Sequence, residues 1–235
     1  MKKTVSLLLA AVLLFSLAAC GTPKQAPAEA QTTEPLTSDT AQSEQADTQP
    51  AGTASAAGKK TLVLYFSAAN TTHADVVSSA TPQVDGSGAT AYLAQLIHEK
   101  VGGDIAAITP AQDYATDYNG TVDEAKRERD DDERPAFQPL NVNPEEYDVI
   151  FIGYPIWWYT LPMVLYTFFD AYDLAGKTIV PFNTHAGSGD GGTYNEIADF
   201  EPDAAVLDGL ALSGSSVGAD SAQQIDTWLS GLHLR

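Results

Sequence analysis

The amino-acid sequence predicts an α/β domain with a doubly wound, five-stranded parallel sheet in the strand order 2-1-3-4-5. Between residues 60 and 235, continuous apolar runs of strand length alternate with segments of helical periodicity. Strands that helices cover on both faces lose the polar–apolar alternation of half-exposed strands and become such runs. Alternating strands and helices favour parallel pairing, because each helix returns the chain to the same end of the sheet.

The first half of this domain contains two predicted strands and two predicted helices. Residues 61–66 form the first buried strand, and residues 104–108 are a shorter candidate for another. A helix begins near Thr90, after a segment that contains Pro82, and its apolar residues keep the 3.6-residue spacing: Leu93, Leu96, Ile97 and Val101. Residues 117–134 are polar and charged, which predicts an exposed helix.

The second half repeats this alternation. Residues 148–153 are the clearest buried strand, and residues 178–182 and 205–212 follow as two more. Residues 161–172 are apolar enough to form a helix that packs on the sheet. Residues 221–232 predict a last helix, with one apolar stripe: Ile225, Trp228, Leu229 and Leu232.

Three of the predicted strands end in loops with distinctive chemistry. In a sheet of this order, a ligand binds at the carboxyl ends of the first and third strands, where the strand order reverses. Small and hydroxyl residues follow the first strand at 67–72, large aromatic residues follow the third at 154–159, and a glycine-rich loop follows the fourth at 183–192. Hydroxyls, aromatic rings and a flexible backbone are therefore expected at one edge of the sheet.

This combination resembles the flavodoxin-like FMN-binding proteins, in particular the branch found in bacterial lipoproteins. The matching segments are residues 64–67, 153–158, Pro162 and 184–189, and the resemblance covers residues 60–234. The resemblance implies a bound FMN and redox chemistry. FMN ends in a phosphate, yet the three loops contain no Lys or Arg, so backbone N–H groups, hydroxyls and a helix N-terminus are expected to hold it.

The details of this site leave two questions open. The loop after the first strand has Ala69 and Asn70 where such loops usually carry a hydroxyl residue and glycine, so we expect a split phosphate site with Ser67 on one side and residues 88–90 on the other. The alternative is that Thr71 and Thr72 hold the phosphate. Trp157 and Trp158 point in opposite directions if their segment is extended, so the sequence leaves open which of them stacks on the flavin.

The residues expected to bind the cofactor are Ser67, Ala68, Gly88, Ala89, Thr90, Pro155, Ile156, Trp157, Trp158, Thr184, His185, Gly187, Ser188 and Gly189.

The first 59 residues have the composition of a leader and a tether. Lys2 and Lys3 precede an apolar run that is shorter than the ~20 residues of a membrane span, so residues 1–19 are interpreted as a signal peptide. Residues 17–21, Leu-Ala-Ala-Cys-Gly, resemble the lipobox of bacterial lipoproteins, which implies cleavage before Cys20 and its lipidation. Ordinary secretion with an incidental cysteine is the alternative. Residues 20–59 then form a lipidated, disordered linker to the flavodoxin-like domain at 60–235.

Composition excludes several classes of function. The chain has 12 Lys and Arg against 31 Asp and Glu, a net charge of −19, and such a surface repels nucleic acids. Cys20 is the only cysteine, which excludes an intrachain disulfide and cysteine-based zinc sites. The four histidines do not have metal-ligand spacing. We therefore expect no metal site and no catalytic side chain, and assign the chemistry to the cofactor.

These observations together predict a flavoprotein that is lipid-anchored to a bacterial membrane and carries electrons in extracytoplasmic redox reactions. Its partner would be a redox protein that docks on the acidic surface, or a small electron acceptor. Two alternatives remain open at this point. One is an FMN-dependent reductase of quinones or other small acceptors, and the other is a flavin-free binding lipoprotein of the same fold.

Overall fold

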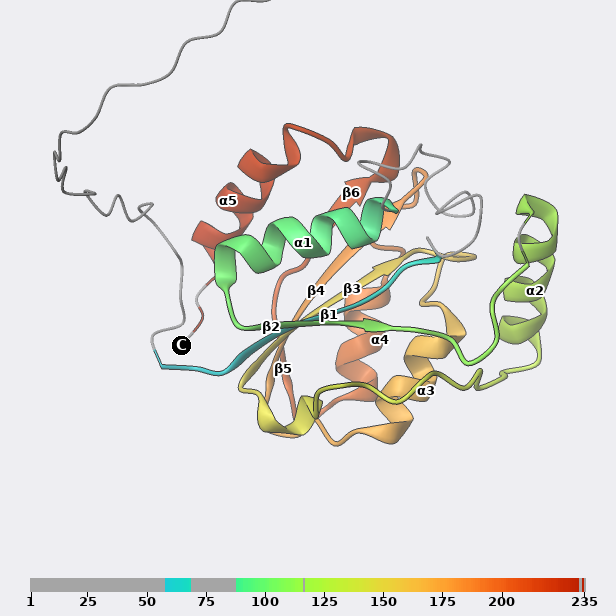
Figure 1. Ribbon diagram of the computed structural model, residues 1–235, viewed down its shortest axis with the longest axis horizontal. Helices are drawn as coiled ribbons and strands as arrows, with labels where there is room; N and C mark the ends of the chain where they lie inside the picture. Colours follow the sequence, from blue (N-terminus) through green and yellow to red (C-terminus); the bar gives the residue numbers. More distant parts are fainter. Residues whose placement is uncertain (1–57, 69–87, 116, 233, 235) are drawn as a thin grey trace, which may run out of the picture. The chain divides into compact units, whose positions relative to one another are not determined.

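A parallel sheet forms the centre of the molecule (Figure 1). Its strands are β1 (Thr61–Phe66), β2 (Asp104–Ile108), β3 (Val149–Pro155), β4 (Thr178–His185), β5 (Ala205–Val206) and β6 (Leu210–Ser213). They lie in the order β2-β1-β3-β4-β5, and β6 also pairs with β4. The predicted doubly wound α/β fold with the order 2-1-3-4-5 is confirmed.

The computed structural model describes residues 58–68, 88–115, 117–232 and 234. The predicted leader, Cys20, nearly all of the predicted linker, and Thr71 and Thr72 lie outside the described residues. No helix in the described parts of the chain is both long and apolar enough to cross a membrane.

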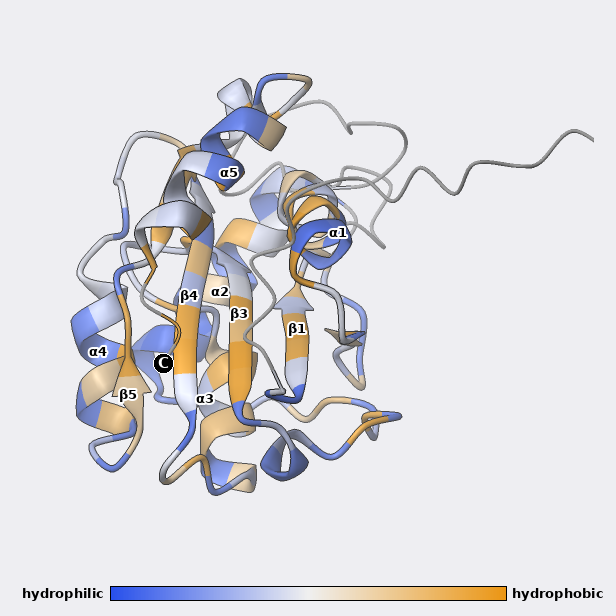
Figure 2. Cartoon of the chain, turned by 90° about the vertical axis from the view of Figure 1, so that its left-hand side faces the viewer, coloured by the Kyte–Doolittle hydropathy of each residue, from blue (hydrophilic) through white to orange (hydrophobic). Residues whose placement is uncertain are grey.

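Helices cover the sheet on both faces. The helices α1 (Ala89–Val101) and α5 (Ser221–Gly231) lie on one face, α3 (Met163–Ala171) and α4 (Thr193–Phe200) lie on the other, and α2 (Tyr118–Asp130) stands at one end of the sheet (Figure 1). Alternate residues of β3 enter the two cores, because Phe151 packs with α1 and α5 while Ile150 and Ile152 face α3. Figure 2 shows the resulting apolar centres of β1, β3 and β4.

The predicted fifth strand is divided in two. Residues 205–212 were expected to pair continuously, and Leu207 N does donate to Ile179 O of β4 (2.9 Å). Two residues further along β4, Pro181 has no N–H group to offer, and a Cβ on Gly209 would lie 2.7 Å from Pro181 O. A proline fits inside β4 because the neighbouring strand is interrupted at this point, so β5 ends and β6 begins after the gap.

Three further boundaries differ from the predictions. The strand β4 continues through residues 183–185, which were expected in the loop, because Asn183 and Thr184 pair with both β3 and β6 and His185 pairs with β6. The helix α4 was not expected; it spans 8 residues, and its buried residues are Thr193 and Ile197. The helix α2 ends at Asp130 rather than at residue 134, and Asp132 has a left-handed φ of 50°.

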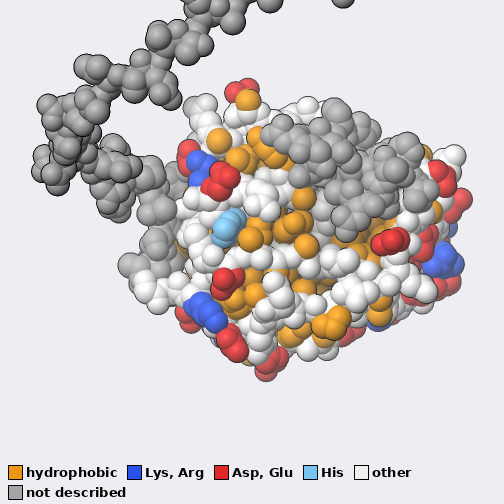
Figure 3. Space-filling view, in the orientation of Figure 1, with side chains coloured by type: hydrophobic (Ala, Val, Ile, Leu, Met, Phe, Trp, Pro, Cys, Tyr) orange, Lys and Arg blue, Asp and Glu red, His pale blue; other side chains and the backbone are white. Residues whose placement is uncertain are grey.

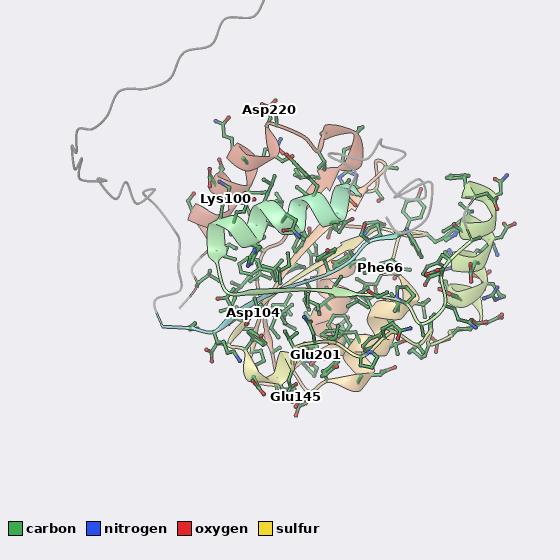
Figure 4. The ribbon with its side chains drawn as sticks, in the orientation of Figure 1. Phe66, Lys100, Asp104, Glu145, Glu201 and Asp220 are labelled. Atoms are coloured by element: carbon green, nitrogen blue, oxygen red, sulfur yellow. The ribbon has the colours of Figure 1, made fainter. Side chains whose placement is uncertain are left out.

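Two glutamate side chains are buried in this fold. Glu128 of α2 is 4% exposed and accepts a hydrogen bond from Tyr114 Oη (3.0 Å). Burial raises the pKa of Glu128 to about 7, although this hydrogen bond opposes the rise. Glu201, at the end of α4 (Figure 4), also has its pKa raised to about 7 by burial, with Asp173 adding to the effect. Both carboxyl groups therefore hold a proton more tightly in the folded state than in the unfolded chain.

We predict that these two groups make the protein less stable as the pH rises from about 5 to about 7.5. In this window the folded state keeps protons that the unfolded chain has released, so the free energy of unfolding falls with pH. Chemical denaturation at the two pH values measures the fall. Glu128→Gln and Glu201→Gln should each reduce it, whereas Glu99→Gln, the same change at an exposed position of α1, should not. The prediction is wrong if all four proteins lose equal stability.

Candidate functional site

The carboxyl ends of β1, β3 and β4 lie together at one edge of the sheet, next to the start of α1 (Figure 1). The strand β1 ends at Phe66, which Figure 4 labels, β3 ends at Pro155, and β4 ends at His185. The strand order reverses between β1 and β3, which is where doubly wound sheets bind their ligands. The three loops singled out in the sequence therefore begin at one place.

An open cavity of about 460 Å³ lies at this edge. Its walls come from α2, from the loop after β3 and from the loop after β4. The lining residues are Tyr118, Val122, Ile156, Trp158, Tyr159, Ala186, Gly187 and Ser188. Three of them are aromatic residues with much of their surface in solvent: Tyr118 is 48% exposed, Trp158 36% and Tyr159 74%. Flat, uncharged walls of this kind suit a planar aromatic ligand.

The two adjacent tryptophans have different environments. Trp157 is 2% exposed and packs edge-on against Phe66 and Tyr114, with ring centroids 5.3 and 4.9 Å apart. Trp158 lines the cavity, and its Nε1 donates a hydrogen bond to Val122 O (3.1 Å). The structure thus places Trp157 in the core and Trp158 in the cavity wall.

Trp158 and Tyr159 form a strained turn. The backbone N–H groups of Trp157 and Thr160 each donate to the carbonyl oxygen of the other (3.1 and 3.0 Å), which closes a two-residue hairpin. Trp158 and Tyr159 have φ values of 51° and 65°, the sign that a type I′ turn requires at both central positions. Because Asn and Gly tolerate this conformation best, each aromatic residue costs roughly 1–2 kcal/mol here.

Polar side chains of β4 hold the glycine loop that follows the strand. Asn183 is fully buried; its Nδ2 donates to Gly189 O (3.0 Å) and its Oδ1 accepts from Tyr194 Oη (2.6 Å). His185 accepts at Nδ1 from Gly187 N (3.0 Å). Burial lowers the pKa of His185, with Asp190 opposing the change, so the imidazole is neutral near pH 7.

The glycine loop also packs against the aromatic turn. Gly191 has a φ of 62°, and a Cβ there would lie 3.0 Å from Tyr159 O, so a larger residue would push the two loops apart. Below the loop, Thr193 Oγ1 donates to Asp190 O (2.6 Å) and is hydrogen-bonded to the buried Tyr154 hydroxyl (2.9 Å). The loops after β3 and β4 therefore support each other.

The start of α1 is joined to the end of β4. The hydroxyls of Thr90 and Thr184 are hydrogen-bonded (2.7 Å), and both residues are fully buried. Gly88 precedes α1 and offers no capping side chain, and the first turn of the helix has no acidic residue. A helix N-terminus carries a partial positive charge, and no acidic side chain of this first turn neutralises it, so this helix end favours a nearby anion.

The structure distributes the predicted binding residues over the cavity and its surroundings. Four of them line the cavity: Ile156, Trp158, Gly187 and Ser188. The remaining ones belong to the adjoining strand ends, the adjoining loops or the start of α1: Ser67, Ala68, Gly88, Ala89, Thr90, Pro155, Trp157, Thr184, His185 and Gly189. Sequence reasoning missed Tyr118, Val122, Tyr159 and Ala186.

The helix α2 was expected to be a solvated helix but forms one wall of the cavity. The side chain of Asp117 caps its start. The guanidinium of Arg129 lies over the Trp158 ring, 5.1 Å from its centroid, and is paired with Asp130 (2.6 Å). Figure 3 shows acidic and basic side chains side by side at this end of the molecule. Tyr118, an aromatic residue in an otherwise polar helix, was the signal that could have revealed this wall.

The chemistry of the cavity is that of a binding site. The lining residues in the described part of the chain provide aromatic rings, three hydroxyls and the backbone of the glycine loop, but no carboxylate, amine or imidazole. The described residues also contain no group of three or more His, Cys, Asp or Glu that could hold a metal ion. Such a site binds and orients a flat molecule, and further chemistry must come from that molecule.

Comparisons with known proteins agree with this geometry. A sequence model of the flavodoxin family matches residues 79–231. A search of curated proteins finds no match. Among solved structures, two proteins assigned as flavoproteins are similar to this chain. The one from Bacteroides eggerthii is 34% identical, covers 74% of this chain and 97% of its own, and has a TM-score of 0.58. The one from Bacteroides uniformis is 32% identical, covers 74% and 99%, and has a TM-score of 0.58.

A third structure, a flavoprotein from Lactobacillus acidophilus in complex with FMN, is 22% identical. It covers 73% of this chain and 99% of its own, with a TM-score of 0.51, and so shows the same fold.

We predict that the two tryptophans differ in their contribution to stability. Trp157→Ala removes a buried ring from its contacts with Phe66 and Tyr114, and should lower the free energy of unfolding by about 3–5 kcal/mol. Trp158→Ala leaves the core intact and should cost no more than about 1.5 kcal/mol. Denaturant unfolding of the two variants measures the difference.

Trp157→Phe is the matched control for this experiment. It keeps an aromatic ring in the core and removes Nε1, a buried donor without a hydrogen-bond partner in the described structure. Its stability should stay well above that of Trp157→Ala. Equal losses for Trp157→Ala and Trp158→Ala would show that the assignment of one ring to the core and one to the cavity is wrong.

Proposed function

This chain belongs to the flavodoxin family, and on that premise we propose that it binds FMN and carries electrons outside the cytoplasmic membrane as a lipid-anchored protein. The observation that carries the proposal is the uncharged aromatic cavity at the carboxyl edge of the sheet, where the strand order reverses. The flavoprotein from Lactobacillus acidophilus, which has the same fold, is in complex with FMN.

The cavity fits the flavin ring. Trp158 and Tyr159 present aromatic surface to it, and a planar ring gains stacking energy from such walls. The glycine loop brings backbone groups of Gly187 and Ser188 to the same cavity. Backbone groups can approach the polar edge of a flavin closely where no Cβ intervenes. Bound FMN would supply the redox chemistry, and these residues would hold and orient it.

The start of α1 fits the phosphate. Among the described residues no Lys or Arg lines the cavity, and the protein as a whole is strongly acidic, so the dianion needs a local source of positive potential. The first turn of α1 after Gly88, which contains no acidic residue, provides such a potential. Because the Thr90 hydroxyl already has Thr184 as a partner, we assign phosphate binding to the backbone N–H groups of this turn, with Ser67 on the opposite side.

A second candidate function is supported by the openness of the site. Tyr118 and Tyr159 keep much of their surface in solvent at the cavity, so a small flat molecule such as a quinone could reach a bound flavin directly. Turnover of small quinones with a nicotinamide reductant and no added protein would favour this reductase function. Reduction that requires a protein partner and weakens steeply with salt would favour an electron carrier.

We predict that the purified protein is yellow and that the cofactor released by heat is FMN. Chromatography of the released cofactor decides the identity, and FAD would contradict the prediction. A colourless protein that takes up no FMN would instead support the flavin-free binding lipoprotein.

In the FMN-binding case, Trp158→Ala should weaken binding by about fivefold, since stacking contributes on the order of 1 kcal/mol. Trp157→Phe, the matched change in the core, should leave the affinity nearly unchanged.

We also predict that Cys20 anchors the protein without contributing to the fold. The lipobox-like residues 17–21 support this part of the proposal, and residues 20–59 separate the cysteine from the sheet. Cys20→Ser should abolish lipid attachment, as measured by incorporation of a labelled fatty acid, while the variant still binds FMN. Loss of FMN binding together with the lipid would contradict the tether. Continued lipid labelling would show that Cys20 is not the attachment site.

A further inference from the structure

The turn formed by Trp158 and Tyr159 needs support from outside. Among the described non-glycine residues, only Asp132 shares its left-handed φ, and aspartate tolerates that conformation better than an aromatic residue does. Such strain persists only where the surrounding structure over-determines the conformation. The contacts that support the turn are made by Thr160, the residue that closes the hairpin.

The side chain of Thr160 meets two others at the back of the turn. Its Oγ1 donates to Glu196 Oε2 of α4 (2.9 Å) and lies 2.7 Å from Tyr166 Oη of α3. Tyr166 Oη in turn donates to the other carboxylate oxygen, Oε1, of Glu196. We call these three residues the Thr160 clamp. Its members come from the hairpin and from α3 and α4, the two helices on one face of the sheet. The clamp therefore connects the turn to both helices by hydrogen bonds.

The chemistry of the clamp favours a fixed geometry. The carboxylate is its only pure acceptor, and both hydroxyls can direct their protons to it. Hydrogen bonds to a charged acceptor are the stronger kind. Burial raises the pKa of Tyr166, and Glu196 raises it further, so the phenol remains a donor at all physiological pH values. None of the three side chains lines the cavity, so the clamp has no direct contact with a ligand there.

We propose that Thr160, Tyr166 and Glu196 are positioning residues, which hold the strained Trp158–Tyr159 turn in the conformation that binds the flavin ring. This inference rests on the proposed FMN function and deepens it. Without the clamp the turn would relax toward negative φ values, and the two aromatic side chains would leave the cavity wall. Binding would then weaken although no residue that touches the ligand has changed.

The test compares four single variants of the purified protein by FMN titration. Glu196→Ala and the nearly isosteric Thr160→Val should each raise the Kd about tenfold, which corresponds to ~1.4 kcal/mol. Glu196→Gln keeps a carbonyl acceptor for Tyr166 Oη and offers an N–H donor to Thr160 Oγ1, whose own proton can turn to Tyr166 Oη 2.7 Å away. It should therefore recover the parent Kd to within about threefold. Asp199→Ala, which removes an exposed carboxylate from the same helix, should leave the Kd unchanged.

Tyr159→Gly separates positioning from general damage. Glycine adopts the left-handed conformation without strain, which leaves Trp158 as the remaining strained residue of the turn and makes the turn depend less on the clamp. The additional effect of Thr160→Val in the Tyr159→Gly background should therefore fall to less than about threefold, whatever Tyr159→Gly does on its own. A tenfold effect that persists in this background would overturn the proposal, as would a Kd for Glu196→Ala equal to that of Asp199→Ala.

The same double-mutant cycle, read as denaturant midpoints of the flavin-free protein, makes the inference independent of the cofactor. Coupling between positions 159 and 160 in the midpoints supports the clamp even if no variant binds FMN, in which case only the proposed function fails. Additive midpoints overturn the clamp even if FMN binds well.

Discussion

Burial of β3 is the constraint on which the rest of this structure depends. Every residue of the strand is buried, because β1 and β4 pair with it on both sides and helices cover both faces of the sheet. A strand in this position uses its backbone polar groups inside the sheet and has no room for polar side chains that need water. Beyond its carboxyl end the chain reaches the surface at the turn of Trp158 and Tyr159. Because parallel pairing brings the ends of β1 and β4 to the same edge, the location of the site follows from the burial of the sheet.

Polar side chains at that edge fix the loops because they have hydrogen-bond partners in neighbouring segments. Asn183 holds the glycine loop, Thr184 bonds to Thr90 at the start of α1, and Tyr154 bonds to Thr193. A buried polar group without a partner is costly, so these pairs leave little freedom to the loops that they join. The result is a cavity whose walls come from separate segments but rest on a common scaffold. The strained aromatic turn can persist on such a scaffold because its neighbours hold it.

An acidic protein that binds an anionic cofactor needs a positive electrostatic potential at the binding site, because its net charge repels the anion. The net charge of −19 opposes the approach of a phosphate, and no Lys or Arg in the part of the chain that the structure describes lines the cavity. In the proposed FMN complex, the backbone N–H groups at the start of α1 provide this positive potential, which does not depend on the side-chain charge of the protein. The acidic surface then remains free to repel nucleic acids and to attract a basic redox partner, which is the role that the proposed function gives it.

The sequence by itself determined the fold class, the strand order and the edge that carries the site, because buried strands and glycine-rich or aromatic loops leave signals in consecutive residues. For Trp157 and Trp158 it predicted opposite directions on an extended segment and left open which of them stacks on the flavin. Only the tertiary structure decided which of them enters the core, since that depends on Phe66 and Tyr114, far away in the chain. The same holds for Tyr118 as a wall of the cavity, for the division of the last strand opposite Pro181, for the burial of Glu128 beside the Tyr114 hydroxyl, and for the hydrogen bonds of Glu196 to Thr160 and Tyr166. Each of these features arises from contacts between segments that no local pattern records, so it became visible only when the chain was folded.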